Sequence, residues 1–177
     1  MKKISYRLLL GALAVLVLLS ACNGGGSQKK VLVFSKTEGF RHQSIPDGVA
    51  MIKKLGEENN FAVVHTEDSE AINEENLKQF DAVVFLSTTG DIFNARQQAD
   101  FERYIQAGGG FVGIHAAADT EYDWPWYGGL VGGYFNGHPN NPNVRDASID
   151  LVDGTHVSTK MLPERWDRTD EWYNYKN

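Results

Sequence analysis

Four short apolar runs spaced along the chain constrain its fold more than any other feature. They are residues 31–35, 61–65, 82–86 and 111–114. Continuous apolar runs of about four or five residues suit strands that other elements cover on both faces. The runs therefore predict four strands of a buried sheet.

Helical patterns separate these runs, and each pattern starts at a residue that can cap a helix. The three patterns cover about residues 44–55, 73–77 and 94–107, and their first residues are the capping candidates Ser44, Asn73 and Asn94. Strand and helix thus alternate, which predicts an α/β fold with a mostly parallel sheet and helices on both faces. Ligands of such sheets bind beyond the carboxyl ends of the strands.

The fourth run ends in a histidine among small residues, in the sequence Gly113-Ile114-His115-Ala116-Ala117. A strand that turns sharply into a helix holds the residue at the turn out into the cleft above the sheet. Such an elbow normally presents a nucleophile. Here the side chain is an imidazole, which serves as a base, a proton donor or a metal ligand. We therefore predict a catalytic role for His115, and not that of a thiol amidase.

Two more histidines are candidates for the same cleft. His42 follows the first strand, and His138 stands between Gly137, which frees the backbone, and Pro139, which fixes an extended exit. Three imidazoles from His42, His115 and His138 could hold zinc and leave a position open for water. No His-x-x-x-His pair supports this set. A metal-free site, in which His42 assists His115, is the alternative.

Carboxylates and aromatic side chains gather in the second half of the chain. The carboxylates nearest the predicted cleft are Asp119, Asp123, Asp170 and Glu171. A pair of them could cleave a glycosidic bond as acid and base, or they could cap turns and face solvent. The aromatic residues are Trp124, Trp126, Tyr127, Tyr134, Trp172 and Tyr173. They form either ordinary core or a platform on which a sugar ring stacks.

The amino terminus has the pattern of an export signal. Lys2, Lys3 and Arg7 precede an apolar run that is shorter than the ~18 residues a spanning helix needs. The box Leu19-Ser20-Ala21-Cys22 resembles the lipobox of bacterial lipoproteins, in which the cysteine is acylated. We expect a signal peptide over residues 1–21, lipidation of Cys22, a tether over 22–29 and a cell-envelope location on the membrane.

Composition excludes several functions. Cys22 is the only cysteine, so the domain itself has no disulfide and no thiolate nucleophile. The chain carries 23 acidic against 17 basic side chains, and signal removal would delete only basic ones. Nucleic acid is therefore not an expected partner.

The last third of the chain predicts one more strand over residues 144–152 and then stops at Asn177. A doubly wound domain would ordinarily continue with a further strand and helix. We therefore expect the domain, residues 30–177, to lack its C-terminal part.

Five motifs in order resemble the ThuA family, named for trehalose utilisation. They are Phe40-Arg41-His42, Gly113-Ile114-His115-Ala116-Ala117-Ala118-Asp119-Thr120, Gly137-His138-Pro139, Leu162-Pro163-Glu164-Arg165-Trp166 and Thr169-Asp170-Glu171-Trp172-Tyr173. The resemblance implies a flavodoxin-like fold of the class I glutamine amidotransferase type. Those amidotransferases have cysteine where this chain has His115, so their ammonia-releasing chemistry is not implied.

The resemblance also implies a role in the breakdown of disaccharides such as trehalose, including 3-keto sugars made by a partner dehydrogenase. We expect His115, His42 and Asp119 to be catalytic. We expect the sugar to be bound by Arg41, Trp126, Asp170, Glu171 and Tyr173. A non-catalytic sugar-binding module and a zinc-dependent hydrolase of other substrates are the alternative functions.

Overall fold

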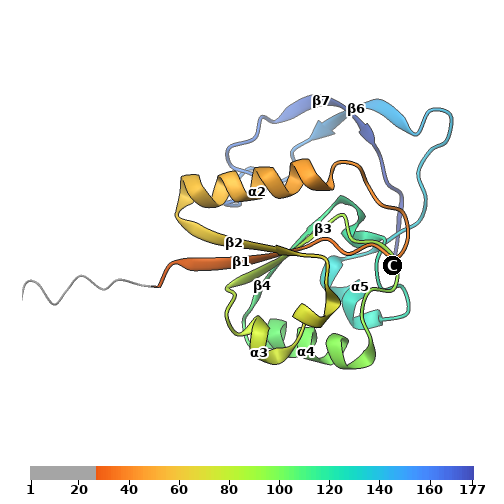
Figure 1. Cartoon of the computed structure of the whole chain (residues 1–177). Coiled ribbons are helices and arrows are strands. Elements are labelled where there is room, and N and C mark those ends of the chain that lie inside the picture. Colours follow the sequence, from red (N-terminus) through yellow and green to blue (C-terminus); the bar gives the residue numbers. More distant parts are fainter. Residues whose placement is uncertain (1–26) are drawn as a thin grey trace, which may run out of the picture.

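The four apolar runs form one parallel sheet in the computed structural model, which describes residues 27–177 (Figure 1). The strands are β1 (Lys29–Phe34), β2 (Phe61–Thr66), β3 (Ala82–Leu86) and β4 (Gly110–Ile114). Their order is β2-β1-β3-β4, and all three pairings are parallel. The predicted α/β fold with a mostly parallel sheet is confirmed.

Helices cover both faces of this sheet (Figure 1). Helix α2 (Ile45–Asn59) lies on one face, and α3 (Glu74–Leu77), α4 (Ala95–Gln106) and α5 (Pro125–Val131) lie on the other. Strand alternation explains the two layers of core, because successive side chains point to opposite faces. Phe34 and Phe85 pack toward α4, whereas Val33 and Val84 pack toward α2.

Two of the three predicted helix caps form as expected. The Asn94 side chain accepts from the N–H groups of Arg96 and Gln97, and the Asn73 side chain accepts from that of Asn76. Ser44 precedes α2 but makes no side-chain cap, so that prediction is wrong. Its backbone is already helical, at φ −74° and ψ −9°, whereas a capping side chain needs an extended backbone to reach the first turn.

The chain after β4 leaves the parallel sheet. A 3₁₀ turn, η2 (His115–Ala118), precedes α5, and β5 (Tyr134–Phe135) pairs antiparallel with β8 (Tyr175–Lys176). The predicted strand over 144–152 is present as β6 (Val144–Asp150), paired antiparallel with β7 (Arg165–Glu171). This hairpin lies on the α2 side of the molecule (Figure 1).

The predicted signal peptide over 1–21, Cys22 and most of the tether lie outside the described residues. Within residues 27–177, no helix is both long and apolar enough to cross a membrane.

The buried carboxylate of Glu121 holds the segment that follows β3 in the sequence. Glu121 is 1% exposed, and its Oε1 accepts from the N–H groups of Ile92 and Phe93, at 2.8 and 2.7 Å. Its Oε2 accepts from Gln98 Nε2 at 2.7 Å. Burial raises the pKa of Glu121, and the three hydrogen bonds oppose that shift. The residue therefore ties the loop after β3 to the segment that follows η2.

We predict that Glu121→Ala lowers the free energy of unfolding by about 2–5 kcal/mol, because it leaves two buried backbone N–H groups and the part-buried Gln98 amide without a partner. Urea denaturation followed by circular dichroism measures the change. Glu58→Ala removes an exposed carboxylate from an i,i+4 pair on α2 and should stay within ~0.5 kcal/mol of the parent chain. Equal losses in the two variants would contradict the role given to Glu121.

Candidate functional site

The backbone makes the predicted elbow at His115. This residue has φ 52°, in the left-handed region that few residues with a Cβ adopt. The alanines behind it are buried, and a Cβ on Gly113 would lie 3.2 Å from the Cβ of Ala117. Small residues are therefore needed where β4 turns into η2. The turn holds the imidazole at the carboxyl edge of the sheet.

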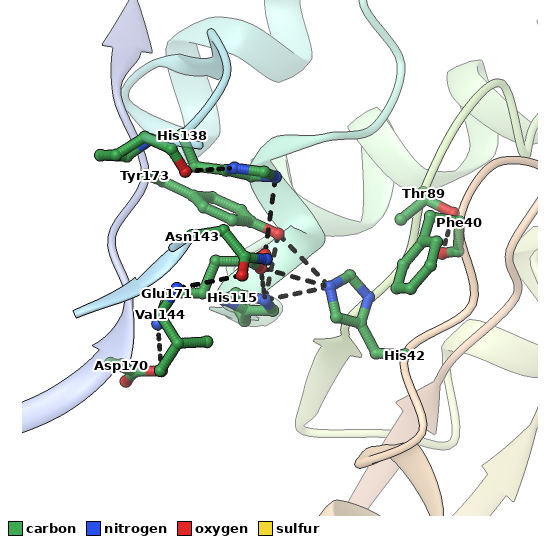
Figure 2. Close-up of polar contacts among 11 residues, drawn as sticks. Phe40, His42, Thr89, His115, His138, Asn143, Val144, Asp170, Glu171 and Tyr173 are labelled. Carbon is green, nitrogen blue, oxygen red and sulfur yellow. Dashed lines mark hydrogen bonds and ion pairs between the residues drawn. The ribbon is translucent and has the colours of Figure 1, made fainter. Parts of the chain in front are cut away.

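His42 reaches the same point from the loop between β1 and α2 (Figure 2). Its Nε2 lies 3.0 Å from Nε2 of His115, and the two rings meet at 84°. The residues are 73 positions apart in the sequence. The structure thus brings together the two histidines that the sequence places at one edge of the sheet.

The end of β7 and the residues after it supply two more polar groups. Glu171 Oε2 lies 3.4 Å from Nε2 of His115 and 3.9 Å from Nε2 of His42. The Tyr173 hydroxyl lies 3.0 Å from Nε2 of His115 and 3.4 Å from Nε2 of His42. Four polar atoms from three separate parts of the chain therefore meet at one place, as Figure 2 shows.

The other oxygen of Glu171 is held from outside this cluster. Oε1 accepts from Asn143 Nδ2 at 2.8 Å and lies 3.5 Å from Nε2 of His138. In the described part of the chain, the residues whose candidate ligand atoms lie within 4.8 Å of one another are His42, His115 and Glu171. His138 lies outside this group, on the far side of the Glu171 carboxylate, so the structure does not bring the three expected imidazoles together.

A pocket of about 280 Å³ opens beside the cluster. Its walls include Phe40, Asp119, Phe135, His138 and Asn143. Asp119 accepts a hydrogen bond from the Tyr122 hydroxyl, so its carboxylate is held at the pocket wall. No sequence signal singles out Asn143 or Phe135, because their place at the site depends on how the chain folds back after α5.

Burial sets the protonation of two groups in the cluster. Desolvation, and then the proximity of His115, lower the pKa of His42. Its imidazole is therefore neutral at pH 7. Desolvation and the negative charge of Glu171 raise the pKa of Tyr173, so its hydroxyl stays protonated and can donate. Nδ1 of His42 is buried without a hydrogen-bond partner.

The structure does not bring three expected sugar-binding residues to this pocket. Arg41 forms a two-pronged pair with Glu67, at 2.9 and 2.7 Å. Trp126 stacks on Trp124 at 5.0 Å and packs against the core, because α5 turns it toward α4.

Asp170 is the third of these residues. It contacts Arg168 at 2.7 Å and accepts from the N–H of Glu171. Successive side chains of a strand point to opposite faces, so Asp170 and Glu171 cannot both face the cluster from β7.

The fold and the site together define a class of protein: a flavodoxin-like α/β domain with a histidine at the strand-end elbow. The family model described as ThuA, trehalose utilisation, matches residues 30–177. The chain belongs to this family.

Two solved structures resemble the domain. A ThuA-like protein from Bacteroides uniformis superposes with a TM-score of 0.70 at 26% identity, over 83% of this chain and 61% of its own. A ThuA-like protein from Parabacteroides merdae gives 0.66 at 19% identity, over 84% and 63%. This chain therefore spans less than two thirds of either protein. No curated protein matches the chain.

We predict a pH-dependent stabilisation from the Arg41 and Glu67 pair. Arg41 holds the pKa of the Glu67 carboxyl below its usual range. Such a group stabilises the folded chain above its unfolded pKa, and the contribution is lost as pH falls through the folded value. Both side chains are nearly half exposed, at 49% and 41%, so the effect should be below ~1 kcal/mol.

Urea titrations of the parent chain and Arg41→Gln measure this effect. The difference in unfolding free energy should be present near neutral pH and absent once Glu67 is fully protonated. A difference that grows as the pH falls would contradict the assignment.

Proposed function

We propose that this chain is a lipid-anchored enzyme of carbohydrate catabolism that acts on a disaccharide or a 3-keto glycoside with His115 as its central acid or base. The family description, trehalose utilisation, supports the substrate class. The observation that carries the proposal is the approach of the two Nε2 atoms, at 3.0 Å, beside a pocket. Histidines so placed can pass a proton to or from a bound ligand near neutral pH.

The residues of the cluster can supply the base and the acid that such a reaction needs. In a 3-keto glycoside the carbonyl acidifies the neighbouring C2–H. A base in the cluster takes this proton, a double bond forms between C1 and C2 as the bond from C1 to the glycosidic oxygen breaks, and that oxygen takes a proton from an acid. His42 is neutral at pH 7 and suits the base, and His115 with the Tyr173 hydroxyl suits the delivery of the proton. Glu171 orients both imidazoles.

The pocket limits the size of what it takes. Its volume of about 280 Å³ lies at the lower end of the ~300–1,000 Å³ usual for small-molecule sites. We infer that it takes one sugar ring and leaves the second ring of a disaccharide outside. Asp119, His138 and Asn143 at its walls offer polar partners for ring hydroxyls.

The proposed location rests on the sequence of the amino terminus. The lipobox around Cys22 would hold the domain at a membrane of the cell envelope through the tether over 22–29. A sugar dehydrogenase in the same compartment is the partner that would supply a 3-keto sugar. The acidic balance of the chain argues against nucleic acid as a partner.

A sugar-binding module without catalysis is less well supported. That alternative used the aromatic stretch as its binding platform. Trp124 and Tyr127 belong to the buried core instead, and Trp126 packs against it.

We predict that His115→Asn lowers kcat/KM at least ~100-fold on the 3-keto derivative of trehalose, because it removes the central imidazole. Asparagine tolerates the left-handed backbone at this position, so the elbow is kept. Mass spectrometry of the products, with trehalose and its 3-keto derivative as substrates, measures the change.

His156→Ala is the matched control, because His156 is exposed and its hydrogen bonds stay within its own loop. It should leave turnover unchanged. Saturable sugar binding without turnover in the parent chain would favour the binding module. Unchanged turnover in His115→Asn would refute the assigned centre.

A further inference from the structure

We propose that Nε2 of His42, Nε2 of His115 and Oε2 of Glu171 bind one divalent transition-metal ion of the zinc class, with an open coordination position toward the pocket. The inference rests on the proposed function for its sugar substrate, and it replaces the acid and base roles given there to the two histidines, because an Nε2 bound to the ion can neither take nor give a proton. Binding of the ion itself does not depend on that function.

The polar atoms around Nε2 of His115 are too many for hydrogen bonding alone. A ring nitrogen carries either one lone pair or one N–H in the plane of the ring, so it makes one straight hydrogen bond. Nε2 of His115 has three polar neighbours at 3.0, 3.0 and 3.4 Å. It cannot satisfy all three as a hydrogen-bonding atom. Atoms that face a common point in this way are suited to one central cation.

The distances are the second argument. An ion about 2.0–2.1 Å from each ligand in tetrahedral geometry places the ligand atoms ~3.3 Å apart. The three separations observed between His42, His115 and Glu171 are 3.0, 3.4 and 3.9 Å. They bracket that value, and a small rotation of the Glu171 side chain would shorten the longest one.

The support behind Glu171 is the third argument. Metal-ligating carboxylates are usually hydrogen-bonded through groups that orient them. Asn143 donates to Oε1 at 2.8 Å, and His138 lies 3.5 Å from the same oxygen. Oε2 is thereby directed at the two imidazoles. His138 is a positioning residue in this arrangement and not a ligand.

The ligand types select the kind of ion. Two imidazoles and one carboxylate suit zinc and other first-row transition metals, whereas magnesium and calcium prefer oxygen ligands alone. Three protein ligands with an open position are the pattern of catalytic rather than structural zinc sites. The side chains of His42, His115 and Glu171 remain 13%, 28% and 21% exposed, so the position is open to a ligand. A sugar carbonyl or hydroxyl oxygen would fit it.

The test is metal binding without any sugar. The full chain, stripped of metal and dialysed against zinc, should retain one zinc ion per chain by elemental analysis. Glu171→Gln and His115→Asn should each weaken zinc binding by more than ~10–100-fold, which is the usual cost of changing a residue that only supports a ligand. His138→Ala should keep the ion, with affinity lowered by no more than that range. His156→Ala should bind zinc as the parent does.

Cobalt(II) in place of zinc separates this site from adventitious binding at Cys22. A site of two nitrogens and one oxygen gives visible d–d bands without the near-ultraviolet thiolate charge-transfer band that cysteine adds. Each variant is checked for folding by circular dichroism before titration, so a loss of affinity is not a loss of fold.

Two outcomes among the variants would overturn the inference. Zinc retained at full affinity by both Glu171→Gln and His115→Asn would place any ion elsewhere. Zinc lost in His138→Ala but kept in Glu171→Gln would assign the ion to three imidazoles instead. A chain that binds zinc but turns over no sugar would fail the proposed function alone, and a chain that turns over sugar but binds no zinc would fail this inference alone.

Discussion

The parallel pairing of β3 with β1 and with β4 is the constraint on which the rest of the structure depends. Phe34 of β1 is in register with Phe85 of β3, and Leu86 of β3 is in register with Ile114 of β4. The strand ends are therefore nearly level, and the segments that follow them emerge at one edge of the sheet. His42 and His115 come from strands on either side of β3 and meet above it.

The parallel sheet alone does not complete the site. Glu171 and Tyr173 arrive from β7, whose only strand partner in the described part of the chain is β6. The hairpin and the parallel sheet therefore both contribute residues to one cluster. Asn143, just before β6, supports Glu171 from the same hairpin. The polar surroundings of His42 and His115 thus depend on the position of the β6–β7 hairpin.

Short apolar runs and polar capping residues carried most of the information that could be obtained about the fold. Strands at the centre of a parallel sheet are apolar on both faces, so they stand out in the sequence. Asn73 and Asn94 cap helices through local contacts, which depend on residues a few positions away. Ser44 has the same chemistry but a helical backbone, and backbone conformation at one residue is not fixed by its identity. The exposed pairing of Arg41 with Glu67 likewise depends on a residue from another strand end.

The sequence by itself determined the α/β class, the elbow at His115 and the arrival of His42 at the same edge, because each follows from local patterns and the geometry of parallel strands. Only the tertiary structure decided the rest of the cluster. It placed Glu171 where a third imidazole from His138 was expected, and it turned Trp126 into the core. The physical reason is that these positions depend on the path of the chain after η2, where short elements and loops leave no periodic pattern, and where contacts between distant residues select one arrangement among many.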